Sequence, residues 1–340
     1  MIGICVIGAG RAGMVHAVNF AKSVPGAKLT AIVDPLEEAA AAACRELGIE
    51  KSYSSHEQAL EDKEIGAYVI VSPTKYHKDV AVGIADAGRH ILCEKPMAMD
   101  INECDQMIAA AEKNGVVLQI GFMRRFDTSF LRAKEIVDSG SIGDVVMVRS
   151  NTRGPSIPQK WMYDIKASNG PLAEVNSHDI DTMRWFTGSE FSSIYAVGGN
   201  YRSPEARDSF PDFYDNVIAA ATFRNGMQGM LDGAQGVGYA YDARVEVLGT
   251  KGCVFIGRIR DDAVVSCTAG TQQANYPLVA SWRRLFKEAY LNEAIAFIEA
   301  IREQSIPKVT GYDGKMAVEV VDAGNRSIAT KQIVYLGDKK

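Results

Sequence analysis

The sequence lacks several features that would place the protein in a special class. Its 340 residues contain no run of about 18 apolar residues, so we expect no segment that spans a bilayer. With 37 basic and 42 acidic side chains and a formal net charge of −5, it offers no basic field for a nucleic-acid partner. The N-terminal residues lack the charged leader and the long apolar stretch of a signal peptide, which predicts a cytoplasmic protein.

Cysteine and histidine are few and widely spaced. The six cysteines form no C-x-x-C pair, which argues against a disulfide framework or structural zinc and predicts buried, reduced thiols. The five histidines form no H-x-x-x-H or H-E-x-x-H pattern, so we expect no metal site. Apolar residues are 47% of the chain, and its length is enough for about two domains with cores of their own.

Up to residue 122, short apolar runs alternate with helical stretches. The predicted strands are 2–7, 29–33, 67–71, 90–93 and 116–120, and the predicted helices are 11–24, 36–47, 75–87 and 101–113. Apolar runs that are continuous rather than alternating are typical of a parallel sheet covered on both faces. The pattern predicts an α/β domain with a doubly wound parallel sheet over residues 1–122.

After residue 123 the pattern changes to strands with hairpin turns. Asn225-Gly226 and residues 249–252 each separate two β-rich runs, as short hairpin loops do. Helices are predicted over 129–138, with Asp127 or Thr128 as the cap, and over 285–304 and 315–330. We expect a C-terminal α+β domain over residues 123–340 with an open, mostly antiparallel sheet.

A glycine-rich turn joins the first predicted strand to the first predicted helix. Gly8, Gly10 and Gly13 form a G-x-G-x-x-G motif completed by Arg11 and Ala12. In this context glycine permits a tight turn and a close backbone approach, and a pyrophosphate binds at the helix N-terminus. The motif predicts dinucleotide binding.

Asp34 follows the second predicted strand, about 20 residues after the glycine turn. A carboxylate at this spacing accepts hydrogen bonds from the adenosine ribose and repels a 2′-phosphate. This favours NAD, while Arg11 beside the turn leaves NADP open as an alternative.

Two further segments carry groups suited to proton transfer. Lys95 follows the predicted strand 90–93, which places it at the carboxyl edge of the parallel sheet, where ligands of doubly wound folds bind. Glu174 and His178 are four residues apart, on one face if the segment is helical. Imidazole moves protons near neutral pH and a carboxylate can orient it. By position alone, Lys95 could equally be a surface charge, and a helical Glu-x-x-x-His pair is common as a plain surface contact.

Together these motifs resemble the glucose-fructose oxidoreductase/inositol dehydrogenase (Gfo/Idh/MocA) family. The segments that carry the resemblance are G-A-G-R-A-G (8–13), V-D (33–34), S-P-T-K-Y-H (72–77), A-G-R-H-I-L-C-E-K-P-M-A (87–98), I-G-F-M-R-R-F-D (120–127) and E-V-N-S-H-D-I-D (174–181). The run 120–127 is most similar to the inositol dehydrogenase branch.

The resemblance implies an N-terminal Rossmann domain and a C-terminal domain whose open sheet forms a homo-oligomer, often a tetramer. It also implies NAD-dependent oxidation of a secondary ring hydroxyl on a cyclic polyol, such as an inositol, or on a sugar. The family's lysine maps onto Lys95, its histidine onto His178, and the acid four residues earlier onto Glu174, where the family usually has aspartate.

These roles define the predicted site. His178 is the predicted base, Lys95 stabilises charge on the substrate oxygen, and Glu174 orients His178. The predicted cofactor contacts are Gly8, Gly10, Arg11, Ala12, Gly13, Asp34, Ser72, Thr74, His77, Glu94 and Lys95. The predicted substrate contacts are Arg125, Asp127, Trp161, Asn176 and Asp179.

Three other functions stay open. A sugar or glucoside dehydrogenase would use the same groups on a pyranose ring. An NAD-dependent glycosidase would form a transient ketone without net consumption of NAD. A non-catalytic NAD sensor would need neither Lys95 nor His178, so it is the least favoured.

Overall fold

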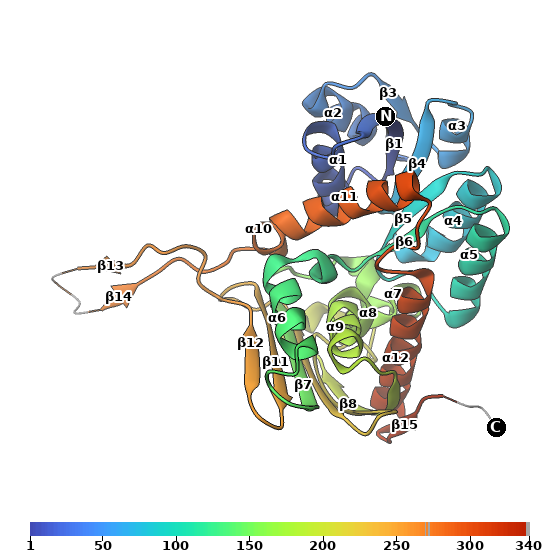
Figure 1. Ribbon diagram of the computed structural model, residues 1–340. Helices are drawn as coiled ribbons and strands as arrows, with labels where there is room; N and C mark the ends of the chain where they lie inside the picture. Colours follow the sequence, from blue (N-terminus) through green and yellow to red (C-terminus); the bar gives the residue numbers. More distant parts are fainter. Residues whose placement is uncertain (269, 271–272, 338–340) are drawn as a thin grey trace. The chain divides into compact units, whose positions relative to one another are not determined.

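The computed structural model describes residues 1–268, 270 and 273–337 (Figure 1). Two compact units are present, and the first contains residues 1–126 together with 288–318. The second contains the rest of the described chain. Each unit is therefore assembled from separate stretches of sequence, and the functional boundary at residue 122 stays a prediction. In the described part of the chain, no helix combines the length and the apolar character needed to cross a bilayer.

The first unit is built on a six-stranded parallel sheet in the order β3-β2-β1-β4-β5-β6. Its strands are β1 (Ile2–Ile7), β2 (Ala27–Val33), β3 (Lys51–Tyr53), β4 (Ile65–Ile70), β5 (His90–Glu94) and β6 (Leu118–Gly121). The order reverses direction between β1 and β4, and ligands of such sheets bind at this point, beyond the carboxyl ends of the strands. The predicted doubly wound parallel sheet is confirmed.

Helices cover both faces of this sheet (Figure 1). On one face, Ile4, Val6 and Val69 of the strands pack with residues of α1 (Arg11–Lys22), α2 (Glu37–Leu47) and α11 (Lys287–Glu303). On the other face, α4 (His77–Asp86) contacts β4 and β5. The remaining helices of the unit are α3 (His56–Leu60), α5 (Ile101–Lys113), η1 (Thr74–Tyr76) and η2 (Met123–Phe126). Because both faces are covered, the interior strands β1 and β4 are largely apolar, as the sequence pattern indicates, whereas the edge strand β3 is polar.

Local signals place the ends of several helices. The Asp100 side chain accepts a hydrogen bond from the N–H of Glu103 at 2.8 Å, which begins α5 at the predicted residue. Glu103 in turn accepts from the N–H of Met99. Helix α2 ends at Gly48, whose φ of +69° is readily adopted by glycine.

The second unit contains a seven-stranded sheet in the order β12-β11-β7-β10-β9-β8-β15. Its strands are β7 (Val145–Gly154), β8 (Phe191–Gly199), β9 (Asn216–Phe223), β10 (Gln228–Gln235), β11 (Asp242–Gly249), β12 (Cys253–Ile256) and β15 (Val334–Tyr335). The pairing of β7 with β10 is parallel and the other five are antiparallel. The predicted mostly antiparallel sheet and both predicted hairpins, β9–β10 and β11–β12, are confirmed.

Helices pack on one face of the second sheet. Helix α9 (Ser177–Thr187) contacts β7 and β10, and α8 (Gly170–Glu174) contacts β9 and β10. In α12 (Gly311–Thr330), the hydroxyl of Ser327 accepts a hydrogen bond from the N–H of Ala196 in β8. The unit also contains α6 (Thr128–Asp138), α7 (Ile165–Ser168), α10 (Trp282–Leu285), η3 (Lys160–Tyr163), η4 (Pro204–Ala206) and a short ribbon of β13 (Ser266–Cys267) and β14 (Ala274–Asn275).

The cysteines are free thiols, as predicted, but not all are buried. Four of them lie in the interior, whereas Cys253 is half-buried and Cys267 is exposed on β13. The expectation of burial is therefore wrong for these two, which lie toward the edge of the second sheet and on the short ribbon.

Candidate active site

The glycine turn after β1 is closed by contacts that exclude side chains. Gly8 has φ +106°, a conformation that side chains rarely adopt, and a β-carbon there would lie 2.9 Å from the carbonyl oxygen of Val71. A β-carbon on Gly13 would lie 1.8 Å from the carbonyl oxygen of Gly8. Glycine at these two positions lets α1 and the residue after β4 approach the turn closely.

Gly10 has a different role. A β-carbon at Gly10 would meet no heavy atom within 4 Å, so the space in front of it is open. Among the described residues, no side chain caps α1 at Gly10, and the first turn carries no acidic side chain. The N–H groups and dipole at this helix terminus favour an anion. Arg11 is exposed at the start of the same helix. The turn therefore fits the pyrophosphate of a dinucleotide.

Asp34 lies at the end of β2 beside this turn. Its Oδ2 accepts a hydrogen bond from the N–H of Ala9 at 2.8 Å, and its Oδ1 accepts one from the N–H of Leu36 at 2.9 Å. These two bonds hold the carboxylate next to the glycine turn, where the adenosine ribose of a dinucleotide lies in this fold. The residues present therefore fit NAD.

The segment after β4 is held through His77. The Nε2 of His77 lies 2.7 Å from the carbonyl oxygen of Ser72, and its Nδ1 lies 2.9 Å from that of Pro96. Burial lowers the pKa of His77, and Thr74 is also buried. The ring of His77 thus connects the loop after β4 to the loop after β5. Direct contacts of Ser72, Thr74 and His77 with NAD stay predictions.

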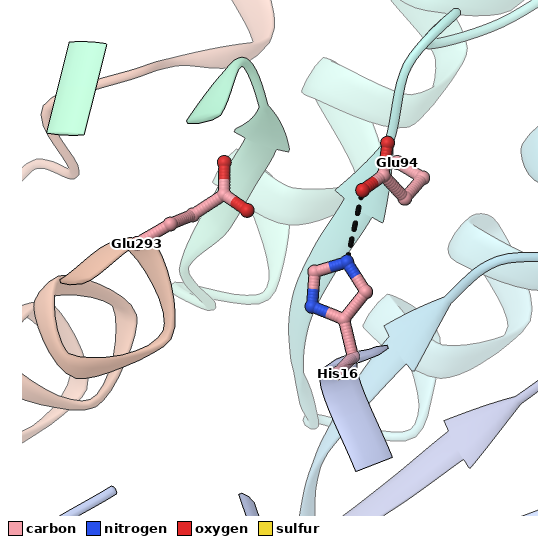
Figure 2. A group of neighbouring side chains, drawn as sticks. All are labelled: His16, Glu94 and Glu293. Atoms are coloured by element: carbon pink, nitrogen blue, oxygen red, sulfur yellow. Dashed lines mark hydrogen bonds and ion pairs between the residues drawn. The ribbon is translucent and has the colours of Figure 1, made fainter. Parts of the chain in front are cut away.

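Lys95 follows β5, at the carboxyl edge of the sheet, where the sequence pattern puts it. Its backbone N–H donates to Oε2 of Glu94 at 3.1 Å, and the Lys95–Pro96 peptide bond is cis. The Oε1 of Glu94 lies 2.9 Å from Nε2 of His16 (Figure 2). Glu94 is buried, so in this structure its carboxylate holds the backbone of Lys95.

Glu174 and His178 belong to two helices in the second unit. Glu174 is the last residue of α8, and His178 lies in the first turn of α9, with a turn at Val175 and Asn176 between the two helices. The segment is therefore not one continuous helix, which was the condition for both side chains to share one helix face. His178 is buried and Glu174 is half-buried.

Asn176 and Asp179 are fully buried at the contact of α9 with β7. Asp179 accepts hydrogen bonds from the hydroxyls of Ser150 and Thr152 at 2.5 and 3.0 Å. It also accepts one from the side-chain amide of Asn176 at 2.8 Å. These bonds hold the start of α9 on the sheet, so both residues position the helix that carries His178. Their contact with substrate stays a prediction.

The other predicted substrate contacts lie in three places. Arg125 in η2 donates to Asp313 at 2.9 Å within the first unit. Asp127 caps α6 by accepting from the N–H groups of Ser129 and Phe130, which confirms it as the helix cap. Trp161 in η3 is 37% exposed, with its Nε1 donating to Gln159.

Sequence reasoning missed His16 and Glu293. Both are buried side chains whose neighbours come from distant parts of the chain. The helical position of His16 indicates a residue facing the sheet. No local signal, however, links α1 to a glutamate on α11.

The fold and the glycine turn define the class of protein. The six-stranded parallel sheet, the turn at Gly8–Gly13 and the carboxylate of Asp34 form an NAD-binding Rossmann domain, as found in nicotinamide-dependent oxidoreductases.

Comparisons with known proteins agree with this class. Residues 2–122 match the model of an oxidoreductase family with an NAD-binding Rossmann fold, GFO/IDH/MocA, and residues 130–255 match the GFO/IDH/MocA C-terminal domain. The chain therefore belongs to the Gfo/Idh/MocA family, and it is an NAD-dependent oxidoreductase, as the resemblance implies.

Individual relatives match over nearly the whole chain. The sequence is 35% identical over 338 residues to a scyllo-inositol 2-dehydrogenase (NAD(+)) of Bacillus subtilis, covering 98% of this chain and 96% of that protein. It is 32% identical over 333 residues to a myo-inositol 2-dehydrogenase of Thermotoga maritima, covering 98% of each. The crystal structure of scyllo-inositol dehydrogenase from Lactobacillus casei with bound NAD(H) and scyllo-inositol superposes with a TM-score of 0.89 at 27% identity, covering 98% of this chain and 99% of that one.

Proposed function

We propose that this protein oxidises a secondary ring hydroxyl of an inositol to a ketone with NAD. The observation that carries the proposal is the match over 98% of the chain to proteins named as scyllo-inositol and myo-inositol 2-dehydrogenases. In the reaction the ring carbon loses its hydride, the oxygen loses its proton, and NAD becomes NADH. The choice between inositol isomers is left to the experiment below.

Two of the proposed residues act on the substrate oxygen, and the third orients one of them. NAD, when bound, accepts the hydride that leaves the ring carbon. His178 removes the hydroxyl proton, because imidazole is a suitable base near neutral pH. Lys95 stabilises the negative charge that develops on the same oxygen, and Glu174 orients His178. The buried bonds from Asp179 to β7 support this role by holding the first turn of α9 in place.

The carboxylate of Asp34 supports NAD as the preferred cofactor. Its two bonds to backbone N–H groups hold a negative charge beside the glycine turn. A 2′-phosphate at the adenosine ribose would meet that charge at short range and be repelled. We therefore infer that NADP is a poor substitute.

An exposed apolar surface on the second sheet supports a homo-oligomer, which we propose to be a tetramer. Val197 and Ile218 are cross-strand neighbours on β8 and β9, with 48% and 49% of their surfaces exposed. Tyr195 and Met230 flank Ala220 on the same face. We call these four residues the open-face row. Contiguous exposed apolar side chains on a sheet are typical of a surface that another subunit covers.

The test of the proposed activity is NADH formation by the purified protein. The panel contains inositol isomers, free aldoses and glucosides, each assayed with NAD and with NADP. We expect one inositol to be oxidised fastest, with NAD preferred.

Other results would replace the proposal. Oxidation confined to sugars would make the protein a sugar dehydrogenase. Cleavage of a glucoside without net NADH would make it a glycosidase. Bound NAD without turnover of any compound would identify a sensor.

A further inference from the structure

A cluster of three buried polar side chains lies in the first unit, and one of them, Glu94, is the residue before Lys95. The reaction proposed above gives this cluster no role. The cluster consists of His16 on α1, Glu94 at the end of β5 and Glu293 on α11 (Figure 2). One polar atom from each side chain lies within 4.8 Å of the others. Two of the three residues are 0% exposed and Glu94 is 5% exposed. Buried groups of this kind are costly unless they are paired, so their arrangement requires an explanation.

Glu94 connects His16 to the backbone of Lys95. Its Oε1 lies 2.9 Å from Nε2 of His16, and its Oε2 accepts from the N–H of Lys95 at 3.1 Å. An ionised carboxylate can only accept, so the His16 tautomer that satisfies this contact carries hydrogen on Nε2. The neighbouring strand leaves room for the carboxylate, because a β-carbon on Gly121 would lie 3.1 Å from Cδ and Oε2 of Glu94.

Glu293 lies beside the carboxyl group of Glu94, but its own carboxyl group makes different contacts. Its carboxyl group points toward the other two side chains in Figure 2. Neither of its oxygens has a hydrogen-bond partner among the described residues. Burial, and next the negative charge of Glu94, raise the pKa of Glu293 well above its usual range. Because no donor among the described residues meets either oxygen of Glu293, and the carboxyl group of Glu94 lies beside it, we infer that Glu293 keeps its proton.

Two side chains face the carboxyl group of Glu293, and two more contact other parts of the cluster. Glu94 faces Glu293 from β5 and His16 faces it from α1. Gln119 on β6 donates its side-chain amide to the carbonyl oxygen of Glu293 at 3.1 Å. Tyr290, on the same helix as Glu293, packs edge-on against the ring of His16 with centroids 5.4 Å apart. Of these, the carboxylate of Glu94 is the group whose charge opposes ionisation of Glu293.

We propose that His16, Glu94 and a protonated Glu293 position Lys95 for catalysis. His16 holds the carboxylate of Glu94, and Glu94 holds the backbone of Lys95. Loss of the proton from Glu293 would put a second negative charge beside Glu94 and disturb both of its bonds. Only the catalytic part of this inference rests on the proposed function, because the state of Glu293 can be measured without substrate.

The first test compares thermal unfolding of the wild type and Glu293→Gln from pH 5 to pH 8. A group whose folded pKa is raised contributes full stability below its unfolded pKa and loses that contribution as pH rises through the folded pKa. Glutamine has nearly the same shape as the protonated side chain of glutamate, but it does not ionise. We expect equal melting temperatures near pH 5 and a variant about 3 °C more stable at pH 8. Glu299→Gln, an exposed position on the same helix, should show no pH-dependent difference.

Two results of this experiment would overturn the inference. A Glu293→Gln variant that is less stable than the wild type at pH 8 would show that the ionised carboxylate stabilises the fold. Stoichiometric divalent metal in the purified protein, lost in the same variant, would show that the three side chains hold an ion instead of a proton.

The second test compares His16→Leu with His16→Gln in steady-state kinetics. Leucine removes the donor to Glu94, and we expect kcat to fall about tenfold with little change in KM for NAD, because Lys95 is misplaced. Glutamine retains an N–H donor and should recover most of the loss. Equal losses in both variants, or a loss confined to KM for NAD, would contradict a positioning role. If the wild type oxidises no polyol, the proposed function fails, whereas the unfolding test still decides the state of Glu293.

Discussion

At the scale of single residues, backbone N–H groups hold the side-chain carboxyl groups of Asp34 and Glu94 in place. Asp34 accepts from the N–H of Ala9 and of Leu36, so its carboxylate is in place beside the glycine turn. Glu94 accepts from the N–H of Lys95 in the same manner. Bonds of this kind hold a group in a fixed geometry, which is what discrimination between cofactors and stabilisation of a developing charge require.

The Asp34→Ser variant tests the basis of cofactor choice. Removing the negative charge ends the repulsion of a 2′-phosphate and also weakens the contacts with the NAD ribose. We expect the ratio of kcat/KM for NADP to that for NAD to rise at least about tenfold. Steady-state kinetics with both cofactors measure it, and Glu37→Gln, an exposed acid in α2, is the control. An unchanged ratio in Asp34→Ser would show that another group selects NAD.

The Lys95→Met variant tests the proposed electrophile. Methionine keeps much of the length of the side chain and removes its charge, so an interaction made mainly in the transition state is lost. We expect kcat to fall about a hundredfold or more, while the Kd for NAD stays within about threefold. Turnover assays and a fluorescence titration measure the two quantities, with the exposed Lys113→Met as control. Turnover close to that of the wild type would remove Lys95 from the mechanism.

Sequence position located single side chains better than it predicted their contacts. The sequence points to Asp34 and Lys95 because strand ends and spacing determine their positions in a doubly wound sheet. Asp179 is predicted as a substrate contact within the segment that carries the family resemblance, and its partners Ser150 and Thr152, on a strand distant in sequence, were not predicted. A single sequence contains no signal for such long-range polar pairs.

At the scale of elements, the turn between β1 and α1 contains glycines with two different roles. Gly13→Ala should lower the free energy of unfolding by about 1–3 kcal/mol, because the added carbon would overlap the carbonyl oxygen of Gly8. Gly10→Ala should change it by less than about 1 kcal/mol, because its new carbon enters open space, yet it should weaken NAD binding about tenfold.

Denaturant unfolding and NAD titration of both glycine variants provide the measurement. Each variant serves as the control for the other, since the substitution is the same and only the surroundings differ. A Gly13→Ala protein as stable as the wild type, or a Gly10→Ala protein that binds NAD normally, would contradict the role given to that glycine.

Elements with strong local signals were predicted well. The buried strands of the first sheet are continuous apolar runs, and Asn225-Gly226 marks the β9–β10 hairpin. The separation of α8 from α9 between Glu174 and His178 was not predicted. Neither of the intervening residues, Val175 and Asn176, is a glycine or proline that would indicate the end of a helix. The interior place of β7, between β11 and β10, depends on pairing between distant segments and is not predictable from local pattern.

At the scale of the whole molecule, chain order and spatial order differ. Ala294, Phe297 and Ile298 of α11 belong to the core of the first unit, although they follow strands β7 to β12 of the second sheet in sequence. The apolar stripe of a helix shows that it is buried but does not identify the sheet that covers it. From chain order, the sequence pattern puts the helix 285–304 with the C-terminal domain, whereas the structure packs α11 in the core of the first unit.

The open-face row predicts the oligomeric state. We expect sedimentation to give the mass of a tetramer, and Ile218→Arg to shift it toward smaller species while the circular dichroism spectrum is retained, because a charge would enter a covered apolar surface. Ile306→Arg, at an 84% exposed position outside the sheet, should leave the mass unchanged. A wild-type monomer, or a tetramer that tolerates Ile218→Arg, would show that this surface forms no interface.

The most direct test of the account is the path of the hydride. The inositol found most active is prepared with deuterium on its ring carbons and oxidised with NAD, and both products are analysed by mass spectrometry. The account predicts that the NADH formed carries deuterium and that ketone and NADH appear in equal amounts. It also predicts that deuterium slows the transfer of hydride from the ring carbon to NAD. NADH without deuterium, or a changed ring product without net NADH, would contradict direct oxidation of a ring hydroxyl by this protein.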